Sequence, residues 1–374
     1  MSLSPAPLTA GAIRIDIVRD ATSGETAEVR LSSTRPTGFS GRLFAGRSPA
    51  EVPGLAARMH ALCGRSHQVA AEIAIVAAMG REIEPVIAER FEGLVAERLG
   101  EHLRATVTSG SGRGLSGDGA VLADVRSVLA SCRTLIAGRD PQRGYEAAKA
   151  IAGIGEAVTR LGLAIDRKGR LGTARGSWGE AMLAVVGPTC EDRFAACDRL
   201  EASDDDAVIA ALARDPTGFA AAPRLPGRRP ETGPAARDAH GQAMADGRAR
   251  LVARLAEIAE ASELLAAPEG DRARMRGDWA TGARVETLTG YAAVESPRGR
   301  LHHLVRLDET GRVASYAVLA PTEWNFHADG PLVATLRLNR FPPGGEGFAR
   351  AERIAGLYDP CVGFEVAIEE RRDA

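Results

Sequence analysis

The chain has 374 residues, of which 45% are hydrophobic and 26% are charged, and its formal net charge is −2. A chain of this length can bury a large core, and its balanced charge gives no electrostatic reason to expect nucleic acid or an anionic membrane as a partner. The sequence contains no run of about 18 apolar residues, the length that a membrane-spanning helix needs. It also shows neither an export signal nor closely spaced cysteine pairs, so we expect a cytoplasmic protein with reduced thiols.

Residues 1–45 are predicted to form an N-terminal β region. Apolar and polar residues alternate over 12–18, as they do in a half-buried strand. Residues 27–31 are expected to pair with this strand across the polar turn Ser23-Gly24-Glu25.

Residues 46–266 are predicted to form a helical body. Its first helix should begin at Ser48-Pro49-Ala50-Glu51, which supplies an N-cap, a proline at N1 and a glutamate at N3. We expect this helix to continue through Ile75 with a bend near Gly64. Apolar residues recurring at helical spacing predict further helices after Pro85 and over 119–137, 144–163 and 241–266.

Three segments of this body are not expected to be helical. The glycine-rich residues 109–118 should form a loop, and residues 165–190 should be irregular chain with short strands. Residues 214–240 are rich in proline, glycine and arginine, which predicts an exposed loop. Such a basic loop could dock a partner or could simply be solvated.

The last segment, 290–374, combines strands and helices around its closing motif. Residues 300–307 and 312–319 alternate and are joined by a polar turn, which predicts a β-hairpin. Helices are expected from about Pro331 and over 345–357. The predicted fold is therefore a single α+β domain, mainly helical, with small β elements near both ends of the chain.

Two motifs far apart in the sequence carry candidate metal ligands. His60, Cys63 and His67 are spaced at i, i+3 and i+7, which on a helix places them along one stripe. Cys361 follows Asp359-Pro360, where a helix must end and the chain can turn a thiol inward. Thiolate and imidazole suit a late transition metal. The alternative is buried structural cysteines beside hydrogen-bonded histidines, since no CxxC pair is present.

Four segments together resemble the large subunits of nickel–iron hydrogenases, and they occur in the same order as in that family. They are Gly46-Arg47-Ser48-Pro49 followed by Arg58, Cys63 and His67; Glu295-Ser296-Pro297-Arg298-Gly299-Arg300-Leu301-His302-His303; Pro321-Thr322-Glu323-Trp324-Asn325; and Tyr358-Asp359-Pro360-Cys361. The resemblance covers most of the chain and implies a large-subunit-like helical body.

The chain departs from that family at its metal ligands. The family holds its metals with four cysteines, and two of those positions are His60 and Phe364 in this chain. The family's closing histidine is replaced by Ala367, and its proton-passing glutamate falls on Ser40 or Gly41. Two cysteines cannot build a nickel site of four thiolates, so we expect no nickel and no hydrogenase catalysis.

This pattern resembles the hydrogenase accessory proteins of the HupK/HoxV type. The resemblance implies a non-catalytic maturation scaffold that carries Fe(CN)2CO, an iron with cyanide and carbonyl ligands. The group would come from maturation proteins of the HypC/HypD type and pass to the hydrogenase large-subunit precursor. Two rivals remain open: a metal-free mimic of the large subunit that acts only through binding, and a divergent redox metalloenzyme.

The resemblance also implies roles for individual residues. Cys63 and Cys361 would be the iron ligands, and His67 would orient a cysteine sulfur unless it is a satisfied core histidine. His60 could bind iron weakly, block nickel or do neither. Arg298 would donate hydrogen bonds to a cyanide nitrogen, unless it makes only an exposed structural ion pair.

The remaining candidate residues are given lesser roles. Pro297 and Asn325 would shape the pocket around the iron. His302, His303 and His327 could make a second cluster, but a joint site is not expected, because His302 and His303 are neighbours on a strand and point to opposite faces. No role is assigned to the other three cysteines, Cys132, Cys190 and Cys197.

Overall fold

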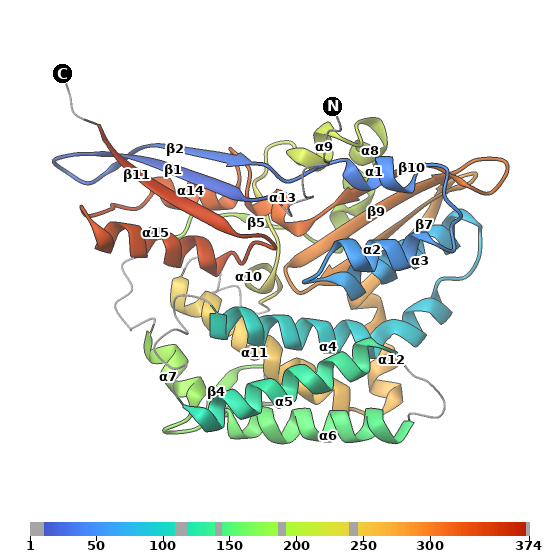
Figure 1. Cartoon of the computed structure of the whole chain (residues 1–374), viewed down its shortest axis with the longest axis horizontal. Coiled ribbons are helices and arrows are strands. Elements are labelled where there is room, and N and C mark those ends of the chain that lie inside the picture. The colour runs from blue at the N-terminus through green and yellow to red at the C-terminus, as the bar shows by residue number, and fades with distance from the viewer. Residues whose placement is uncertain (1–10, 109–117, 139–143, 186–191, 239–245, 372–374) are drawn as a thin grey trace, which may run out of the picture.

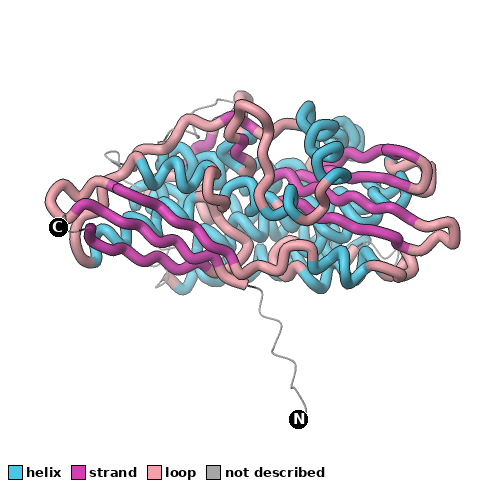
Figure 2. Tube along the Cα trace, turned by 90° about the horizontal axis from the view of Figure 1, so that it is seen from above, coloured by secondary structure: helices cyan, strands magenta, loops and turns pink. Residues whose placement is uncertain are grey.

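Two β-sheets lie along one side of the molecule, and long helices lie beneath them in the view of Figure 1. Seen from above in Figure 2, the two sheets occupy opposite ends of that face. The computed structural model describes residues 11–108, 118–138, 144–185, 192–238 and 246–371. None of the helices in these ranges is long and apolar enough to cross a membrane.

The first sheet joins the two ends of the chain. Its strand order is β11-β1-β2, with β1 antiparallel to β2 and parallel to β11; the bounds are β1 (Ile13–Asp20), β2 (Thr26–Ser33) and β11 (Phe364–Arg371). The alternation over β1 buries Ile13, Ile15 and Ile17 against α14 (Pro331–Arg337) and α15 (Gly345–Leu357). The β1–β2 pairing and both helices were predicted correctly, whereas β11 was not predicted.

The second sheet contains the predicted hairpin and two further strands. Its antiparallel order is β10-β9-β8-β7, with bounds β7 (Ala280–Glu286), β8 (Thr289–Ser296), β9 (Gly299–Leu307) and β10 (Val313–Leu319). Helix α1 (Phe39–Phe44) packs on β10, and α3 (Gly64–Ala78) packs across the other strands. Gly290 permits this close packing, because a Cβ there would lie 2.3 Å from the backbone nitrogen of Ala78.

The helical layer is built around α4, which contacts α3, α5, α11 and α12. Its members are α4 (Glu84–Thr108), α5 (Gly119–Ile136), α6 (Gly144–Arg160), α11 (Gly247–Ala266) and α12 (Glu269–Trp279). The helices expected after Pro85, over 119–137, over 144–163 and over 241–266 are therefore present in the described part. Because neighbours surround α4, even its polar residues Glu97, Arg98 and His102 are buried.

The helix expected from Ser48 is divided in two. The backbone N–H of Ser48 donates to Glu51 at 3.2 Å, but the expected start at Ser48 was wrong, since the N-cap of α2 (Val52–Met59) is Glu51. Helix α2 ends before His60, and α3 restarts at Gly64. Gly64 allows the sharp turn, because a Cβ there would lie 2.7 Å from the carbonyl oxygen of Ala57. The bend was predicted correctly. The expectation that the candidate ligands lie along one continuous helix was wrong.

The exposed loop expected over 214–240 is only partly exposed. Most residues up to Arg229 are exposed, but 230–236 are almost all buried. Side-chain contacts explain this: the amide of Asn325 bonds to the backbone of Thr232. The expectation was therefore wrong for the second half of this segment, and 239–240 lie outside the described residues.

Short elements complete the described chain. They are β3 (Leu163–Ile165), β4 (Leu171–Thr173), α7 (Trp178–Val185), β5 (Asp198–Arg199), the 3₁₀ turn Ala202–Asp204, α8 (Asp205–Arg214), α9 (Gly218–Ala221), β6 (Pro230–Glu231), α10 (Pro234–Arg237) and α13 (Pro321–Asn325). The short strands expected within 165–190 are present, and α7 was not expected. The glycine-rich loop expected at 109–118 falls outside the described residues except for its last position.

Candidate metal centre

The turn between α2 and α3 brings Cys63 close to Cys361, although 298 positions separate them in the sequence. Cys63 is the N-cap residue of α3 and is buried, whereas Cys361 follows the end of α15 and is half-buried. Burial raises the pKa of the Cys63 thiol well above its usual value, neighbouring Cys361 raises it further, and Arg298 lowers it. These three groups therefore interact electrostatically across the site.

Arg298 joins the two sides of the site. It lies in the turn between β8 and β9 with 4% of its surface exposed, and its guanidinium contacts Glu101 at 3.2 Å and Asp359 at 3.5 Å. Its ion pairs are thus mostly shielded from water, so the alternative of an exposed ion pair was wrong. Its Nη1 has no hydrogen-bond partner among the described residues. That N–H group remains available to a bound group.

Asp359 and Thr322 hold the Cys361 side. Asp359 has a positive φ of 47°, a conformation that non-glycine residues adopt mainly in tight turns. The Thr322 hydroxyl donates to Cys361 Sγ at 3.3 Å and accepts the backbone N–H of Cys361 at 3.4 Å. The turn and these two bonds fix the direction of the thiol. The sequence places Thr322 in a motif but gives no sign that it contacts Cys361.

A chain of buried histidines lies on the Cys63 side. The His60 and His67 rings stack with centroids 3.4 Å apart, and His67 Nδ1 lies 2.9 Å from His303 Nε2. His303 Nδ1 lies 2.6 Å from the Tyr316 hydroxyl. Burial lowers the pKa of His60 to about 4, and it lowers the pKa values of His67 and His303 well below the usual range. All three imidazoles are therefore neutral near pH 7.

The hydrogen bonds of this chain set its tautomers. The Tyr316 hydroxyl has no other acceptor recorded in the described part, so it donates to His303 Nδ1. His303 then donates from Nε2 to Nδ1 of His67, which leaves His67 with its proton on Nε2. His67 is thus satisfied within the core at its Nδ1. His302 points to the opposite face and contacts Asp205 at 2.9 Å, as strand alternation predicted.

Glu97 supports the N-terminus of α3. It accepts hydrogen bonds from the backbone N–H groups of Arg65 at 2.6 Å and Ser66 at 2.8 Å, and from the Ser66 hydroxyl. Burial nevertheless raises the pKa of this carboxyl to about 7. A carboxylate on a distant helix thus caps the helix that begins at Cys63. No local sequence pattern identifies this role.

A glutamate at Gly41 would require its neighbours to move. Gly41 lies in α1 against β10, and a Cβ there would be 2.7 Å from the Tyr316 carbonyl oxygen. Ser40 is buried in the same helix. His60 and Phe364 lie in different elements, since His60 lies in the α2–α3 turn and Phe364 pairs with Ile13 in the sheet.

The other predicted residues shape the surroundings. The Asn325 amide bonds to the backbone of Thr232 at 2.8 and 3.2 Å, and the Pro297 carbonyl accepts from Arg237 at 3.1 Å. Cys132 is buried in α5 and Cys197 is half-buried, and burial raises both thiol pKa values to about 12. Cys190 lies outside the described residues.

The donor set limits what the site can hold. Within the described ranges, no group of three or more histidine, cysteine, aspartate or glutamate side chains could hold a metal ion. A bare ion normally takes four protein donors at a structural site. Two thiols beside a guanidinium suit a metal group that brings ligands of its own.

Known proteins provide the decisive comparison. No family model matches the chain. It is 37% identical over 336 residues to the hydrogenase expression/formation protein HupK of Bradyrhizobium diazoefficiens, covering 88% of this chain and 90% of that protein. It is 34% identical to HupK of Rhizobium leguminosarum, covering 98% and 99%. The chain belongs to the HupK/HoxV family of hydrogenase expression/formation proteins.

Further matches agree with this HupK/HoxV assignment. HoxV of Cupriavidus necator is 30% identical, covering 91% of this chain and 93% of that protein. Among solved structures, an NAD⁺-reducing [NiFe]-hydrogenase chain has a TM-score of 0.61 at 15% identity, covering 94% of this chain and 98% of that one. The latter similarity shows the fold alone. This HupK/HoxV protein therefore has the fold of a hydrogenase large subunit, as predicted.

Proposed function

We propose that this chain is a non-catalytic scaffold of hydrogenase maturation, which holds an Fe(CN)2CO group between Cys63 and Cys361. The observation that carries the proposal is the grouping of these two thiols with Arg298 at a site where the described residues offer no set of three or more metal-binding side chains. A group with three diatomic ligands needs few protein ligands, so two thiolates suffice. The names of the HupK and HoxV relatives support a role in hydrogenase formation.

The proposal gives the surrounding residues separate tasks. Arg298 would donate through its free Nη1 to a cyanide nitrogen, a charge-assisted hydrogen bond. His67 would present its Nε2–H toward the site, held by the chain that ends at Tyr316. Thr322 would direct Cys361. Nickel has no place in this scheme because its four-thiolate site cannot be assembled.

The scaffold would exchange its cargo with other proteins. We propose that a maturation complex of the HypC/HypD type loads the iron group and that the large-subunit precursor receives it. The described cysteines are free thiols, which suits the reducing cytoplasm that we propose as the place of exchange. A partner protein would reach the iron group from the side of Cys361, because this residue is only half-buried.

Infrared spectroscopy with iron analysis tests the proposal. The protein is purified without oxygen from cells that produce the maturation proteins. We expect carbonyl and cyanide stretching bands that disappear in Cys63→Ser and Cys361→Ser and persist in Cys197→Ser, the matched control thiol. Folded protein with neither bands nor iron would contradict the scaffold proposal.

A second candidate function is a metal-free mimic of the large subunit that acts by binding assembly partners. It is favoured by the fold match over 94% of the chain together with the small donor set in the described residues. Hydrogenase maturation in cells separates the two candidates. Full maturation with Cys63→Ser or Cys361→Ser would favour the mimic, whereas nickel or hydrogen turnover in the purified protein would favour an enzyme.

A further inference from the structure

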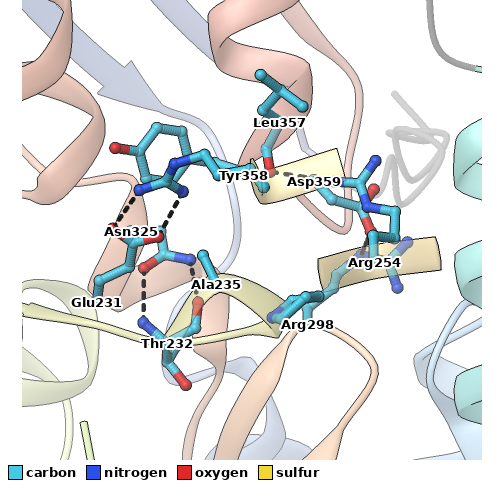
Figure 3. Close-up of a pocket in the computed structure, with 11 residues that line it drawn as sticks. Glu231, Thr232, Ala235, Arg254, Arg298, Asn325, Leu357, Tyr358 and Asp359 are labelled. Atoms are coloured by element: carbon cyan, nitrogen blue, oxygen red, sulfur yellow. Dashed lines mark hydrogen bonds and ion pairs between the residues drawn. The ribbon is translucent and has the colours of Figure 1, made fainter. Parts of the chain in front are cut away.

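The segment 230–237, which is mostly buried, contacts the part of the fold that holds Cys361. The Asn325 side chain bonds to the backbone of Thr232 at 2.8 and 3.2 Å, and Figure 3 shows both hydrogen bonds. Asn325 lies in α13 together with Thr322, whose hydroxyl donates to Cys361 Sγ. The segment is therefore attached to the helix that directs this thiol.

The same segment packs closely against the β8–β9 turn, which carries Arg298. Thr232 Oγ1 accepts the backbone N–H of Arg300 at 2.8 Å. Gly299 has a positive φ of 128°, and a Cβ on it would overlap with Thr232 Oγ1. A Cβ on Gly233 would lie 3.0 Å from the carbonyl oxygen of Arg298. Glycine at these two positions lets the two stretches of backbone approach each other.

Arg237, the last residue of α10, binds the same turn through its carbonyl groups. Its guanidinium donates to the carbonyl oxygens of Ser296 at 3.2 Å and Pro297 at 3.1 Å. It also donates to Glu295 at 2.9 Å and to the two oxygens of Glu257 at 2.8 and 2.9 Å. These five bonds use all five N–H donors of a guanidinium. Arg237 therefore joins α11, which carries Glu257, to the backbone of the β8–β9 turn.

We propose that Arg237 and Thr232 are positioning residues for Arg298. They hold the β8–β9 turn in the place from which the Arg298 guanidinium reaches the bound iron group. Because the segment 230–237 is also bonded to α13, it couples the position of this arginine to that of Cys361. The inference rests on the proposed iron-carrying function, but the fixed turn is a property of the metal-free protein as well.

Hydrogen exchange in the metal-free, full-length protein tests whether Arg237 and Thr232 fix the turn. Arg237→Lys keeps the charge but offers three donors in place of five, so it cannot bind both the carboxylates and the carbonyl oxygens. We expect the backbone amides of residues 298–300 to exchange at least about tenfold faster in this variant. Thr232→Val removes the acceptor of the Arg300 amide and should accelerate exchange in the same turn. It keeps the test open if Arg237→Lys does not fold.

Arg272→Lys is the matched control. Arg272 also makes well-shielded ion pairs, to Glu92 at 2.8 Å and Glu269 at 3.0 Å, but these residues belong to α4 and α12. The control should lose stability without faster exchange at residues 298–300. If Arg237 only stabilises the fold, Arg237→Lys will behave in the same way.

Infrared spectra of the loaded protein test whether the fixed turn acts on the bound group. A hydrogen bond to a cyanide nitrogen polarises the ligand and changes its stretching frequency. Arg237→Lys should therefore retain iron but shift a cyanide band from its wild-type position, while Arg272→Lys should shift none.

The outcomes separate this inference from the proposed function. Unchanged exchange in both Arg237→Lys and Thr232→Val would overturn the fixed turn. Faster exchange with unshifted cyanide bands would overturn the positioning of Arg298. A wild-type protein without cyanide bands would contradict the proposed function and with it the role of the turn toward iron, whereas the exchange rates would still decide whether the two residues fix the turn.

Discussion

The two thiols of the candidate centre lie in unlike surroundings. Cys63 begins a core helix, is 7% exposed and is backed by stacked histidines and a capping carboxylate. Cys361 lies in a turn after α15, is half-buried and is directed by one hydroxyl group. Under the proposed function, we expect a division of labour in which the Cys63 side would anchor the bound group and the Cys361 side would admit and release it.

Arg298 is the group that both sides share, so its loss should have the largest effect. Arg298→Met leaves Asp359 shielded from water without its ion pair to Arg298, while Glu101 keeps only its ion pair to Arg104 at 2.9 Å. We expect the free energy of unfolding to fall by about 3 kcal/mol, as when one partner of a buried ion pair is removed. Urea unfolding measures this, with the exposed Arg306→Met as the control. If Arg298→Met lowers the free energy of unfolding no more than Arg306→Met does, Arg298 does not join the Cys63 and Cys361 sides of the site.

The capping of Cys63's helix should make stability depend on pH. Burial raises the pKa of Glu97 to about 7 from an ordinary 4.5. Between pH 4.5 and pH 7, therefore, Glu97 is protonated in the folded state and ionised in the unfolded state. The contribution of Glu97 to the free energy of unfolding is fully present below pH 4.5 and is lost as the pH rises through 7. A pKa change of this size corresponds to a change in the free energy of unfolding on the order of 3 kcal/mol.

Glu97→Gln should flatten that pH dependence, because glutamine does not titrate. Chemical unfolding at several pH values between 5 and 8 compares the variant with the wild type. Glu146→Gln, on the outer helix α6, is the control and should leave the profile unchanged. Parallel profiles for wild type and Glu97→Gln would show that this carboxyl titrates normally.

Chemical modification should distinguish the two thiols directly. Cys361 should react with iodoacetamide at least about tenfold faster than Cys63, because burial shields Cys63 and raises its thiol pKa. Mass spectrometry of peptides from native protein follows both rates, and unfolded protein supplies the reference in which they become similar. Equal rates in the native protein would remove the proposed division of labour.

The histidine chain on the Cys63 side should contribute the smallest effect. Tyr316→Phe removes the hydrogen bond to His303, at a cost of about 1 kcal/mol in the free energy of unfolding. It should also release the fixed tautomer of His67, which nitrogen NMR of the imidazoles detects. A His67 spectrum unaltered by Tyr316→Phe would show that this chain does not set the tautomer.

Much of the fold could be predicted because its periodicity is local. The alternation of β1 and the helical spacing of α5 and α6 were sufficient, since one face of each is buried. Strand β7 was missed because its last four residues, from Ala283 on, are all exposed and so show no alternation of burial. The segment 230–236 was misjudged because its burial depends on the distant Asn325.

Of the candidate site, only the residues that lie in recognisable motifs could be predicted. The resemblance to hydrogenase large subunits singled out Cys63, Cys361 and Arg298, which the fold brings together. Glu97 could not be found, because it acts on a segment that is remote in the sequence. Its role arises from packing between helices, which local patterns do not encode.

X-ray absorption at the iron edge tests the central claim most directly, because it counts the sulfur atoms bound to iron. Protein loaded in cells that produce the maturation proteins should show two sulfur ligands. Cys63→Ser and Cys361→Ser should each lose the iron or retain a single sulfur, while Cys197→Ser should keep both. Iron without sulfur ligands, or with two in either single variant, would contradict the account.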